Sequence, residues 1–202
     1  MAKVVSTLFI TADGVAEIDF AWHFPSFDEN MGRAVGEDYE QGNVLLLGRG
    51  TYDSFAGAWP DREAAGGEDA TFAARLGDTR KVVVSRSPLE FTWRGSEQLR
   101  GDLVEAVTAL KDEPGVTGVL IPGSISIVQQ LLAAGLVDEL RLLVHPVAAR
   151  KGQKLFDDGA VPYHLKVTAT EVFPTGVIRV IYAPVEAPAP VSYEQVTGQG
   201  PE

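Results

Sequence analysis

Short apolar runs bounded by turn residues recur along the chain. The run Val44–Leu47 is apolar at every position, a pattern typical of a strand buried on both faces of a sheet. The same kind of pattern predicts strands at Lys3–Ile10, Arg80–Ser87 and Val116–Ile121, and a longer strand over Leu136–Val147. The run Val44–Leu47 is too short to be a helix.

Between these strands, apolar residues recur at helical spacing. The predicted helices run from Asp28 or Asn30 to about Gln41, from the turn after Gly48 to near Trp59, over Ala70–Leu76, from Asp102 to about Pro114, and from Ser124 or Ser126 to Ala134. The stretch Asp61–Glu68 is rich in glycine, alanine and charged residues and is expected to be a surface loop.

The order of these elements predicts an α/β domain with a mostly parallel central sheet flanked by helices. Two alternating segments, Tyr163–Phe173 and Val177–Ala183, predict an antiparallel C-terminal hairpin closed by Pro174-Thr175-Gly176. We expect one domain over residues 1–183. Residues 184–202 contain several prolines and few apolar residues, and are expected to be a disordered tail.

Composition narrows the possible functions. The net charge of −11 argues against nucleic acid or an anionic membrane surface as the main partner. The chain has no cysteine, so disulfides and thiolate chemistry are excluded. No apolar run approaches the ~20 residues of a membrane span, and no signal-peptide pattern opens the chain, so we expect a cytoplasmic protein.

Three predicted strands end in turns suited to phosphate groups. These turns are Gly48-Arg49-Gly50-Thr51, Ser85-Arg86-Ser87 and Gly123-Ser124-Ile125-Ser126. Glycine lets the backbone approach a ligand, a helix N-terminus offers free N–H groups, and arginine adds positive charge. The third glycine of the Rossmann fingerprint and the Gly-Lys-Ser/Thr of a P-loop are both absent. Three such turns together predict a phosphate-rich ligand.

With these motifs in order, residues 3–183 resemble the dihydrofolate reductase fold. Within that fold they resemble the C-terminal reductase domain of riboflavin-biosynthesis deaminase-reductases and their small stand-alone relatives. The matching segments are Thr11–Gly14, Trp22–Pro25, Leu47–Tyr52, Lys81–Arg86, Gly123-Ser124, Gly135–Leu140 and His145-Pro146, followed by Gly152, Leu155 and Phe156.

The resemblance implies NADPH as the cofactor and assigns residues to it. The implied cofactor-binding residues are Thr11 and Ala12 at the nicotinamide, Gly48, Arg49, Gly50 and Thr51 at the pyrophosphate and 2′-phosphate, Ser85 and Arg86 at the adenosine, and Gly123, Ser124, Ile125 and Ser126 at the second pyrophosphate turn. Trp22 and Phe27 would lie beside the substrate. No metal site is expected, because no two histidines have the spacing of a metal-binding pair.

The resemblance implies an NADPH-dependent reductase of a small polar heterocyclic or imine substrate. The proton would come from Asp13, Asp28 or water. The substrate implied first is 5-amino-6-(5-phosphoribosylamino)uracil of riboflavin biosynthesis, and dihydrofolate is second. Folate reductases carry a carboxylate at the register that falls near Gly32 here, where no acid stands. A non-catalytic NADP-binding module stays open, and relatives suggest a homodimer formed through the C-terminal strands.

Overall fold

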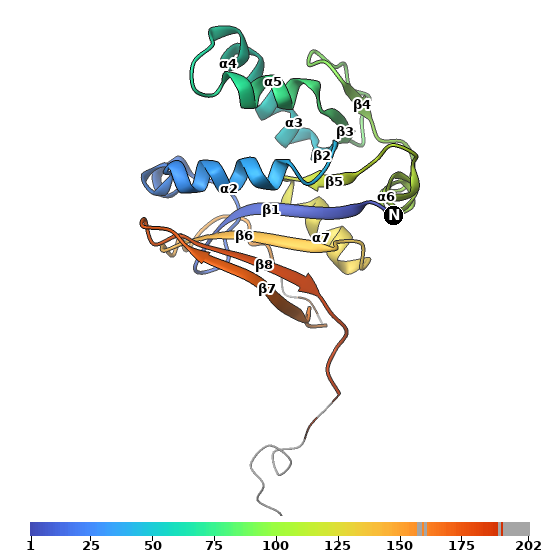
Figure 1. Ribbon diagram of the computed structural model, residues 1–202. Helices are drawn as coiled ribbons and strands as arrows, with labels where there is room; N and C mark the ends of the chain where they lie inside the picture. Colours follow the sequence, from blue (N-terminus) through green and yellow to red (C-terminus); the bar gives the residue numbers. More distant parts are fainter. Residues whose placement is uncertain (157–158, 160, 190, 192–202) are drawn as a thin grey trace, which may run out of the picture.

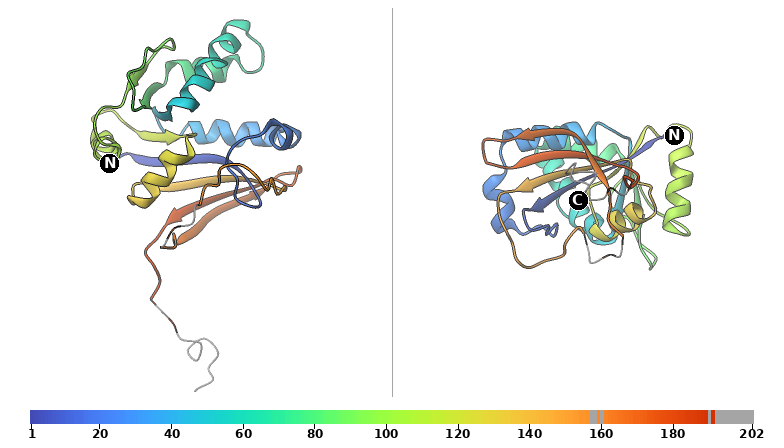
Figure 2. Two further views of the ribbon diagram at one scale, coloured as in Figure 1. Left: turned by 180° about the vertical axis from the view of Figure 1, so that it is seen from behind. Right: turned by 90° about the horizontal axis from the view of Figure 1, so that it is seen from below.

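The computed structural model describes residues 1–156, 159, 161–189 and 191, which form a single eight-stranded sheet with helices on both sides (Figures 1 and 2). Its strands are β1 (Lys3–Thr11), β2 (Val44–Gly48), β3 (Arg80–Val84), β4 (Ser96–Gln98), β5 (Gly118–Ile121), β6 (Glu139–His145), β7 (Leu165–Val172) and β8 (Ile178–Pro184). Their order across the sheet is β4-β3-β2-β5-β1-β6-β8-β7. Strands β1 to β6 pair in parallel, whereas β8 is antiparallel to β6 and β7. The predicted mostly parallel α/β fold with a C-terminal antiparallel hairpin is confirmed.

The helices cover the sheet from both sides. They are α1 (Phe20–His23), a 3-10 turn (Phe24–Ser26), α2 (Glu29–Tyr39), α3 (Arg49–Ala56), α4 (Trp59–Ala65), α5 (Ala70–Asp78), α6 (Leu103–Asp112) and α7 (Ile125–Ala133). Asp28 and Asp102 cap α2 and α6 through their carboxylates. Asp102 was predicted outright, and of the two residues predicted for α2, Asp28 or Asn30, the structure selects Asp28. Among the described residues, no helix has the length and apolar character needed to cross a membrane.

Strand β2 shows why an uninterrupted apolar run predicts a strand that is buried on both faces. Val44 and Leu46 belong to the core cluster that contains side chains of α6 and α7. Leu45 and Leu47 belong to the cluster on the opposite face, with side chains of α3 and α5. Because successive strand residues point to opposite faces, a strand covered on both sides must be apolar at every position.

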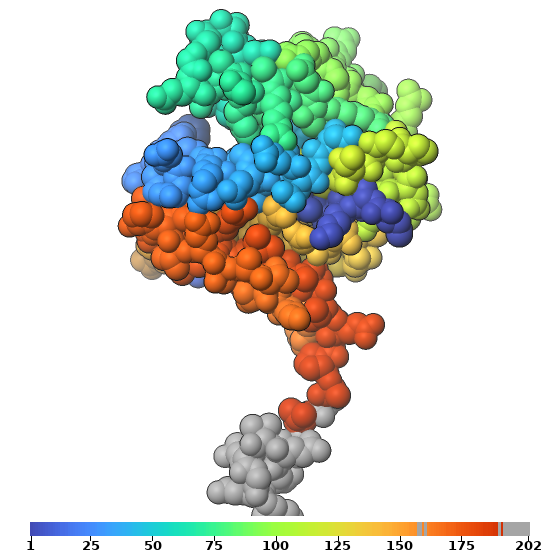
Figure 3. Space-filling view, viewed as in Figure 1, coloured from blue at the N-terminus to red at the C-terminus, as the bar shows by residue number. Residues whose placement is uncertain are grey.

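Helix α2 crosses the second face between α3–α5 and the C-terminal hairpin (Figure 3). Its Asp38 is buried and pairs with two buried arginines, Arg141 of β6 at 2.7 Å and Arg179 of β8. Thr7 of β1 donates a further hydrogen bond to the same carboxylate. The two ion pairs and the hydroxyl of Thr7 connect three strands to one helix, and buried charges of this kind require such partners.

Two local predictions need correction, and one strand was not predicted. The expected loop at Asp61–Glu68 is largely helix α4, because Pro60 occupies its first turn, where proline is tolerated. The predicted strand from Leu136 begins only at Glu139, since the N–H of Leu136 donates to Leu131 and completes the C-terminal turn of α7. Strand β4 was not predicted; its three residues carry no apolar pattern.

The C-terminal hairpin extends slightly beyond the predicted domain boundary. Strand β8 reaches Pro184, and the N–H of Val185 donates to the carbonyl of His164 at 2.9 Å. Residues 185–189 and 191 are exposed. Residues 190 and 192–202, which carry most of the predicted tail, lie outside the described residues.

Candidate functional site

The three predicted phosphate turns lie at the carboxyl ends of three neighbouring strands. The turns follow β3, β2 and β5, which are adjacent and parallel in the sheet. Parallel strands place their carboxyl ends at one edge, so the three turns meet there, and ligands of open α/β sheets bind at this edge.

The turns after β2 and β5 are in direct contact. The N–H of Gly48 donates to the carbonyl of Gly123 over 3.4 Å. A Cβ atom on Gly48 would lie 2.6 Å from Ser124 Oγ, and one on Gly123, where φ is +147°, would lie 2.9 Å from Thr51 Oγ1. Glycine is therefore required at both positions for the turns to approach this closely. The peptide bond between Gly123 and Ser124 is cis.

The turn after β3 contacts the turn after β2 through Arg49. Arg49 donates from Nη1 to Ser87 Oγ over 3.3 Å, and its Nε lies 3.5 Å from Asp53. Ser85 Oγ accepts from the N–H of Ser87, and Gln98 donates to the carbonyls of Ser85 and Ser87, so the turn has a fixed shape. Arg86 is exposed and forms no ion pair with a described residue. Two guanidinium groups thus lie on exposed turns of this edge.

Helices α3 and α7 begin at this edge without a side-chain cap. Their N-cap residues, Gly48 and Ser124, make no side-chain hydrogen bond to the helix, unlike Asp28 and Asp102 at α2 and α6. The hydroxyls of Ser124 and Ser126 lie 3.0 Å apart at the start of α7. First-turn N–H groups of both helices are therefore available to an anionic ligand. Together with Arg49 and Arg86, this donor set fits the phosphates of a dinucleotide.

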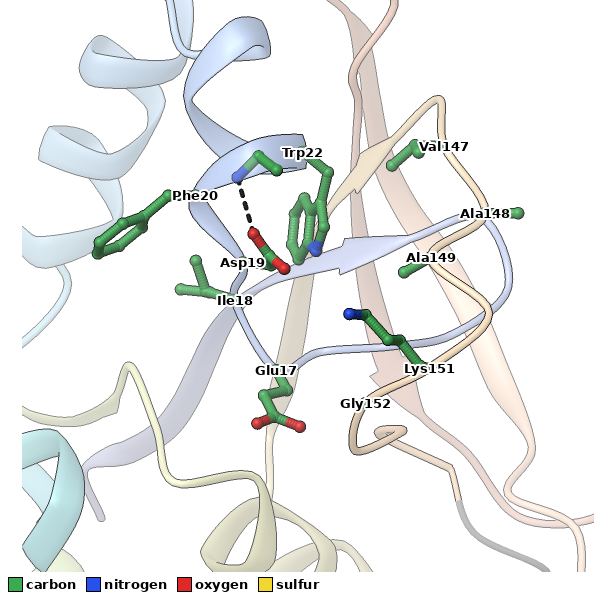
Figure 4. A pocket seen from close by; sticks show the side chains of 11 residues that line it. Glu17, Ile18, Asp19, Phe20, Trp22, Val147, Ala148, Ala149, Lys151 and Gly152 are labelled. Carbon is green, nitrogen blue, oxygen red and sulfur yellow. Dashed lines mark hydrogen bonds between the residues drawn. The ribbon is translucent and has the colours of Figure 1, made fainter.

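A pocket of about 870 Å³ lies beyond the carboxyl ends of β1 and β6, next to these turns in the strand order (Figure 4). One wall is the loop of residues 17–22, and the other consists of Val147, Ala148, Ala149, Lys151 and Gly152. The second wall was missed by the sequence analysis. The rule that ligands bind beyond parallel strands could have pointed to it, because β6 ends two residues earlier.

Thr11 and Asp13 join the end of β1 to the second wall of this pocket. Asp13 accepts hydrogen bonds from Thr11 Oγ1 at 2.6 Å and from the N–H groups of Ala149 at 3.0 Å and Arg150 at 2.8 Å. The bond from Thr11, followed by that from Arg150, lowers the pKa of Asp13 below its usual value. Ala12 is exposed at the end of β1 and donates to the carbonyl of Val147. Asp13 therefore acts as a structural acceptor, and its lowered pKa keeps it ionised, without a proton to donate.

Asp28 is likewise engaged in structure. Its carboxylate accepts from the N–H of Met31 at 2.9 Å and from Asn30 at 3.1 Å. The bond from Met31 is the main cause that lowers the pKa of Asp28. Asp28 is absent from the pocket lining. The geometry brings neither predicted carboxylate to the pocket as a free acid.

Of the two aromatic residues predicted to contact the substrate, only one lies in the pocket. Trp22 lines the pocket, whereas Phe27 is exposed and packs against His23 with a ring separation of 5.6 Å. Trp22 also packs edge-on against His145, with ring centroids 4.8 Å apart. The structure therefore brings Trp22 alone of this pair to the pocket.

Behind Trp22 lies a buried histidine pair that the sequence analysis missed. His23 Nδ1 and His145 Nε2 are 3.3 Å apart, and His145 Nδ1 lies 3.0 Å from the carbonyl of Leu143. A carbonyl can only accept, so His145 donates from Nδ1 and accepts from His23 at Nε2. Burial first, and then the neighbouring His145, lower the pKa of His23 to about 4. The two residues are 122 positions apart, and no local pattern in the sequence links them.

Comparison with known proteins shows to which family this chain belongs. The family model for the RibD C-terminal domain matches residues 2–179. The uncharacterized protein YyaP of Bacillus subtilis strain 168 is 28% identical over 185 residues, which cover 89% of this chain and 94% of that protein.

Solved structures share the fold at lower identity. A putative riboflavin biosynthesis protein from Shewanella sp. PV-4 has a TM-score of 0.69 at 18% identity, covering 92% of this chain and all of that one. The deaminase/5-amino-6-(5-phosphoribosylamino)uracil reductase of Thermotoga maritima has a TM-score of 0.62 at 18% identity, covering 91% of this chain and 57% of that one. At these identities the likeness concerns the fold.

Proposed function

The chain belongs to the family of the RibD C-terminal domain, and on that premise we propose that it is an NADPH-dependent reductase of a small polar heterocyclic or imine substrate. One observation carries this proposal. Along one edge of the sheet, three phosphate-type turns follow β3, β2 and β5, and the pocket follows at β1 and β6. This order suits an extended dinucleotide whose reactive ring ends beside the pocket.

The chain's own residues would bind and orient the cofactor and the substrate, and would exclude water from them. Arg49, Arg86 and the first turns of α3 and α7 would hold the phosphates, and Thr11 and Ala12 would border the nicotinamide. When bound, NADPH supplies a hydride for reduction of a C=N or C=O bond. Trp22 would pack against the substrate ring. We propose water as the proton source, because Asp13 and Asp28 accept several hydrogen bonds and have lowered pKa values.

The first substrate to test is 5-amino-6-(5-phosphoribosylamino)uracil, for which the Thermotoga maritima reductase is named. Dihydrofolate is second. The structural engagement of Asp13 and Asp28 favours one alternative, a protein that binds NADP without catalysis. Steady oxidation of NADPH with either substrate would separate an enzyme from a binding module, which would never consume the cofactor.

The preference for NADPH over NADH directly tests whether the three turns bind phosphate. NADPH should bind at least ~10-fold more tightly than NADH, because arginine forms strong charge-assisted hydrogen bonds with a phosphate. Arg49→Ala and Arg86→Ala should each reduce that ratio while leaving NADH affinity unchanged. Arg62→Ala, which removes an exposed arginine from α4, is the matched control. Equal affinity of the parent protein for both cofactors in calorimetric titration would contradict the assignment.

We also propose a homodimer formed through the C-terminal strands. Among the residues that the structure describes, strand β7 pairs only with β8 and forms an edge of the sheet, with Val167 and Val172 exposed by 51% and 69%. An open edge of this kind readily pairs with another chain. Light scattering of the protein and of Val172→Lys tests the proposal. A monomer at micromolar concentration would contradict it.

A further inference from the structure

The position of Trp22 in the pocket wall depends on the contacts made by α1. The Trp22 indole is half-buried and extends from α1 on the pocket side of that helix (Figure 4). The first turn of α1 is held by Asp19, whose carboxylate accepts from the N–H of Ala21 at 2.8 Å and whose carbonyl accepts from the N–H of Trp22. A helix of four residues is not stable by itself. The sheet against which α1 packs must therefore fix the orientation of Trp22.

A histidine pair joins α1 to the sheet. His145 ends β6, is fully buried, and donates from Nδ1 to the carbonyl of Leu143 at 3.0 Å. His23 ends α1 and donates from Nδ1 to Nε2 of His145 over 3.3 Å. Among the hydrogen bonds of the described residues, this one alone connects a side chain of α1 to the sheet. The Trp22 ring packs edge-on against His145 as well, so His145 contacts both the indole and the residue that follows it.

The surroundings of His23 favour an uncharged ring. The ring centroid of Phe9 of β1 lies 4.2 Å away, and those of Phe24 and Phe27 lie at 5.4 Å and 5.6 Å. Among the described residues, the one titratable group that acts on His23 is His145. Burial has the larger effect, and together the two lower the pKa of His23 to about 4.

The surroundings of His145 are similar. Phe9 and Trp22 face its ring, with centroids at 6.0 Å and 4.8 Å. Burial lowers the pKa of His145, and hydrogen bonds with the backbone of Leu143 and Ile10 offset part of this effect. Within the described part of the chain, no carboxylate and no cation contacts either histidine through a hydrogen bond or an ion pair. Burial therefore keeps the pair uncharged at neutral pH.

We propose that the His23–His145 pair positions Trp22: with both rings neutral it holds α1 against β6 and the indole in the pocket wall, and protonation of the pair releases them. His145 is thus a positioning residue, which acts on the site through Trp22. The proposal deepens the proposed function and rests on it, because the pocket is the proposed substrate site. The position of Trp22 can nevertheless be measured without cofactor or substrate.

Each added proton weakens the contact between α1 and β6. A proton on Nε2 of His145 removes the acceptor for His23 and places two N–H groups opposite each other. A proton on His23 instead places a charge among aromatic rings, away from water. The pKa of His23 is about 4 while α1 is bound to β6 and returns to 6.5 once the ring is exposed to water, so the bound form loses stability as the pH falls below 6.5. Relative to pH 8, this difference raises the ratio of released to bound α1 by about 30-fold at pH 5 and by up to about 300-fold in stronger acid.

The fluorescence of Trp22 reports where its ring lies. The difference between the protein and Trp22→Phe removes the signals of Trp59 and Trp93. We expect this difference signal, followed from about pH 8 to about pH 4, to become more accessible to acrylamide and to move to longer wavelength as histidine takes up protons. Far-UV circular dichroism of the same samples shows whether the chain stays folded.

Three single variants test whether the pair itself is responsible. His145→Phe keeps a ring but removes the acceptor, so Trp22 should already be accessible at neutral pH. His23→Asn keeps an amide donor near the position of Nδ1 and cannot take up a proton, so Trp22 should stay shielded and lose most of its response to acid. The control His164→Asn removes a histidine just before β7, at the opposite end of β6 from the pocket, and should leave the response unchanged.

Three results would overturn the proposal. They are a Trp22 signal that does not change with pH while the chain stays folded, a His145→Phe protein in which Trp22 is as shielded as in the parent, and a control that changes the response as much as His23→Asn does. If His145→Phe does not fold, the parent protein and His23→Asn still decide the question. Binding of NADPH to the parent protein is measured separately. Its absence would contradict the proposed reductase, whereas the fluorescence alone decides what positions Trp22.

Discussion

Gly48→Ala should force apart the two central turns of the site. The added Cβ would lie 2.6 Å from Ser124 Oγ and 2.8 Å from Ser124 Cβ, both well inside contact distance. Gly48 is also the N-cap of α3, a position where alanine is disfavoured. The change should therefore displace the start of α7 relative to β2, and with it the N–H groups that the proposed cofactor would use.

The size of the effect follows from two contributions. Overpacking of a close contact costs about 1–3 kcal/mol, and alanine restricts the unfolded chain, which offsets roughly 0.4–1 kcal/mol. The net loss of unfolding free energy is about 1–2 kcal/mol, and the melting temperature should fall by about 2–8 °C for a chain of this size. Affinity for NADPH should fall as well, because the two helix starts no longer converge.

Gly50→Ala is a control in the same turn, and its expected effect on the unfolding free energy has the opposite sign. Gly50 lies within α3, and no atom lies within 4 Å of its added Cβ. Alanine should stabilise the helix there by up to ~1 kcal/mol. Both variants are measured by urea unfolding and by NADPH calorimetry.

Ser124→Gly should rescue Gly48→Ala, because it removes the Oγ and Cβ atoms and leaves the backbone nitrogen, at 3.4 Å, as the nearest group. In a double-mutant cycle, the two changes should show a favourable coupling of at least ~0.5 kcal/mol. The reasoning is wrong if Gly48→Ala unfolds at the same urea concentration as the parent protein, or if Ser124→Gly gives no rescue.

Three further predictions concern stability and substrate. His23 has a pKa of about 4 in the folded protein against 6.5 when unfolded, so the unfolded chain binds the extra proton between these values. Stability should fall by about 3 kcal/mol as the pH drops from 6.5 to 4, and His23→Phe should flatten that part of a urea–pH profile. Asp38→Asn leaves Arg141 and Arg179 with an incomplete counter-charge and should lower the unfolding free energy by about 3 kcal/mol in the same assay. Dihydrofolate should be reduced at least ~10²-fold more slowly than by an ordinary folate reductase, because no acid stands near Gly32; turnover at ordinary rates would contradict this.

Much of the fold could be predicted from local sequence. The run Val44–Leu47 marks a strand covered on both faces, and Asp28 and Asp102 mark helix starts, because burial and capping are satisfied within a few residues. The three turns were located at strand ends for the same reason, since glycine, serine and arginine there form a local signal, and their binding of phosphate stays a prediction. Pro60 shows the limit of this reasoning: the same residue can follow one helix or open another, and here it opens α4.

The sequence by itself determined most of the order of strands and helices, though not α4 or β4, together with the apolar faces and the candidate phosphate turns. Only the tertiary structure decided that Gly48 packs on Ser124, that Asp13 is occupied by N–H groups of residues 149 and 150, and that His23 meets His145 behind Trp22. These contacts join residues between 76 and 137 positions apart, as from Gly48 to Ser124 and from Asp13 to Arg150. Hydrophobic periodicity reports which side of an element is buried, but it does not report which distant polar group will complete a hydrogen bond there.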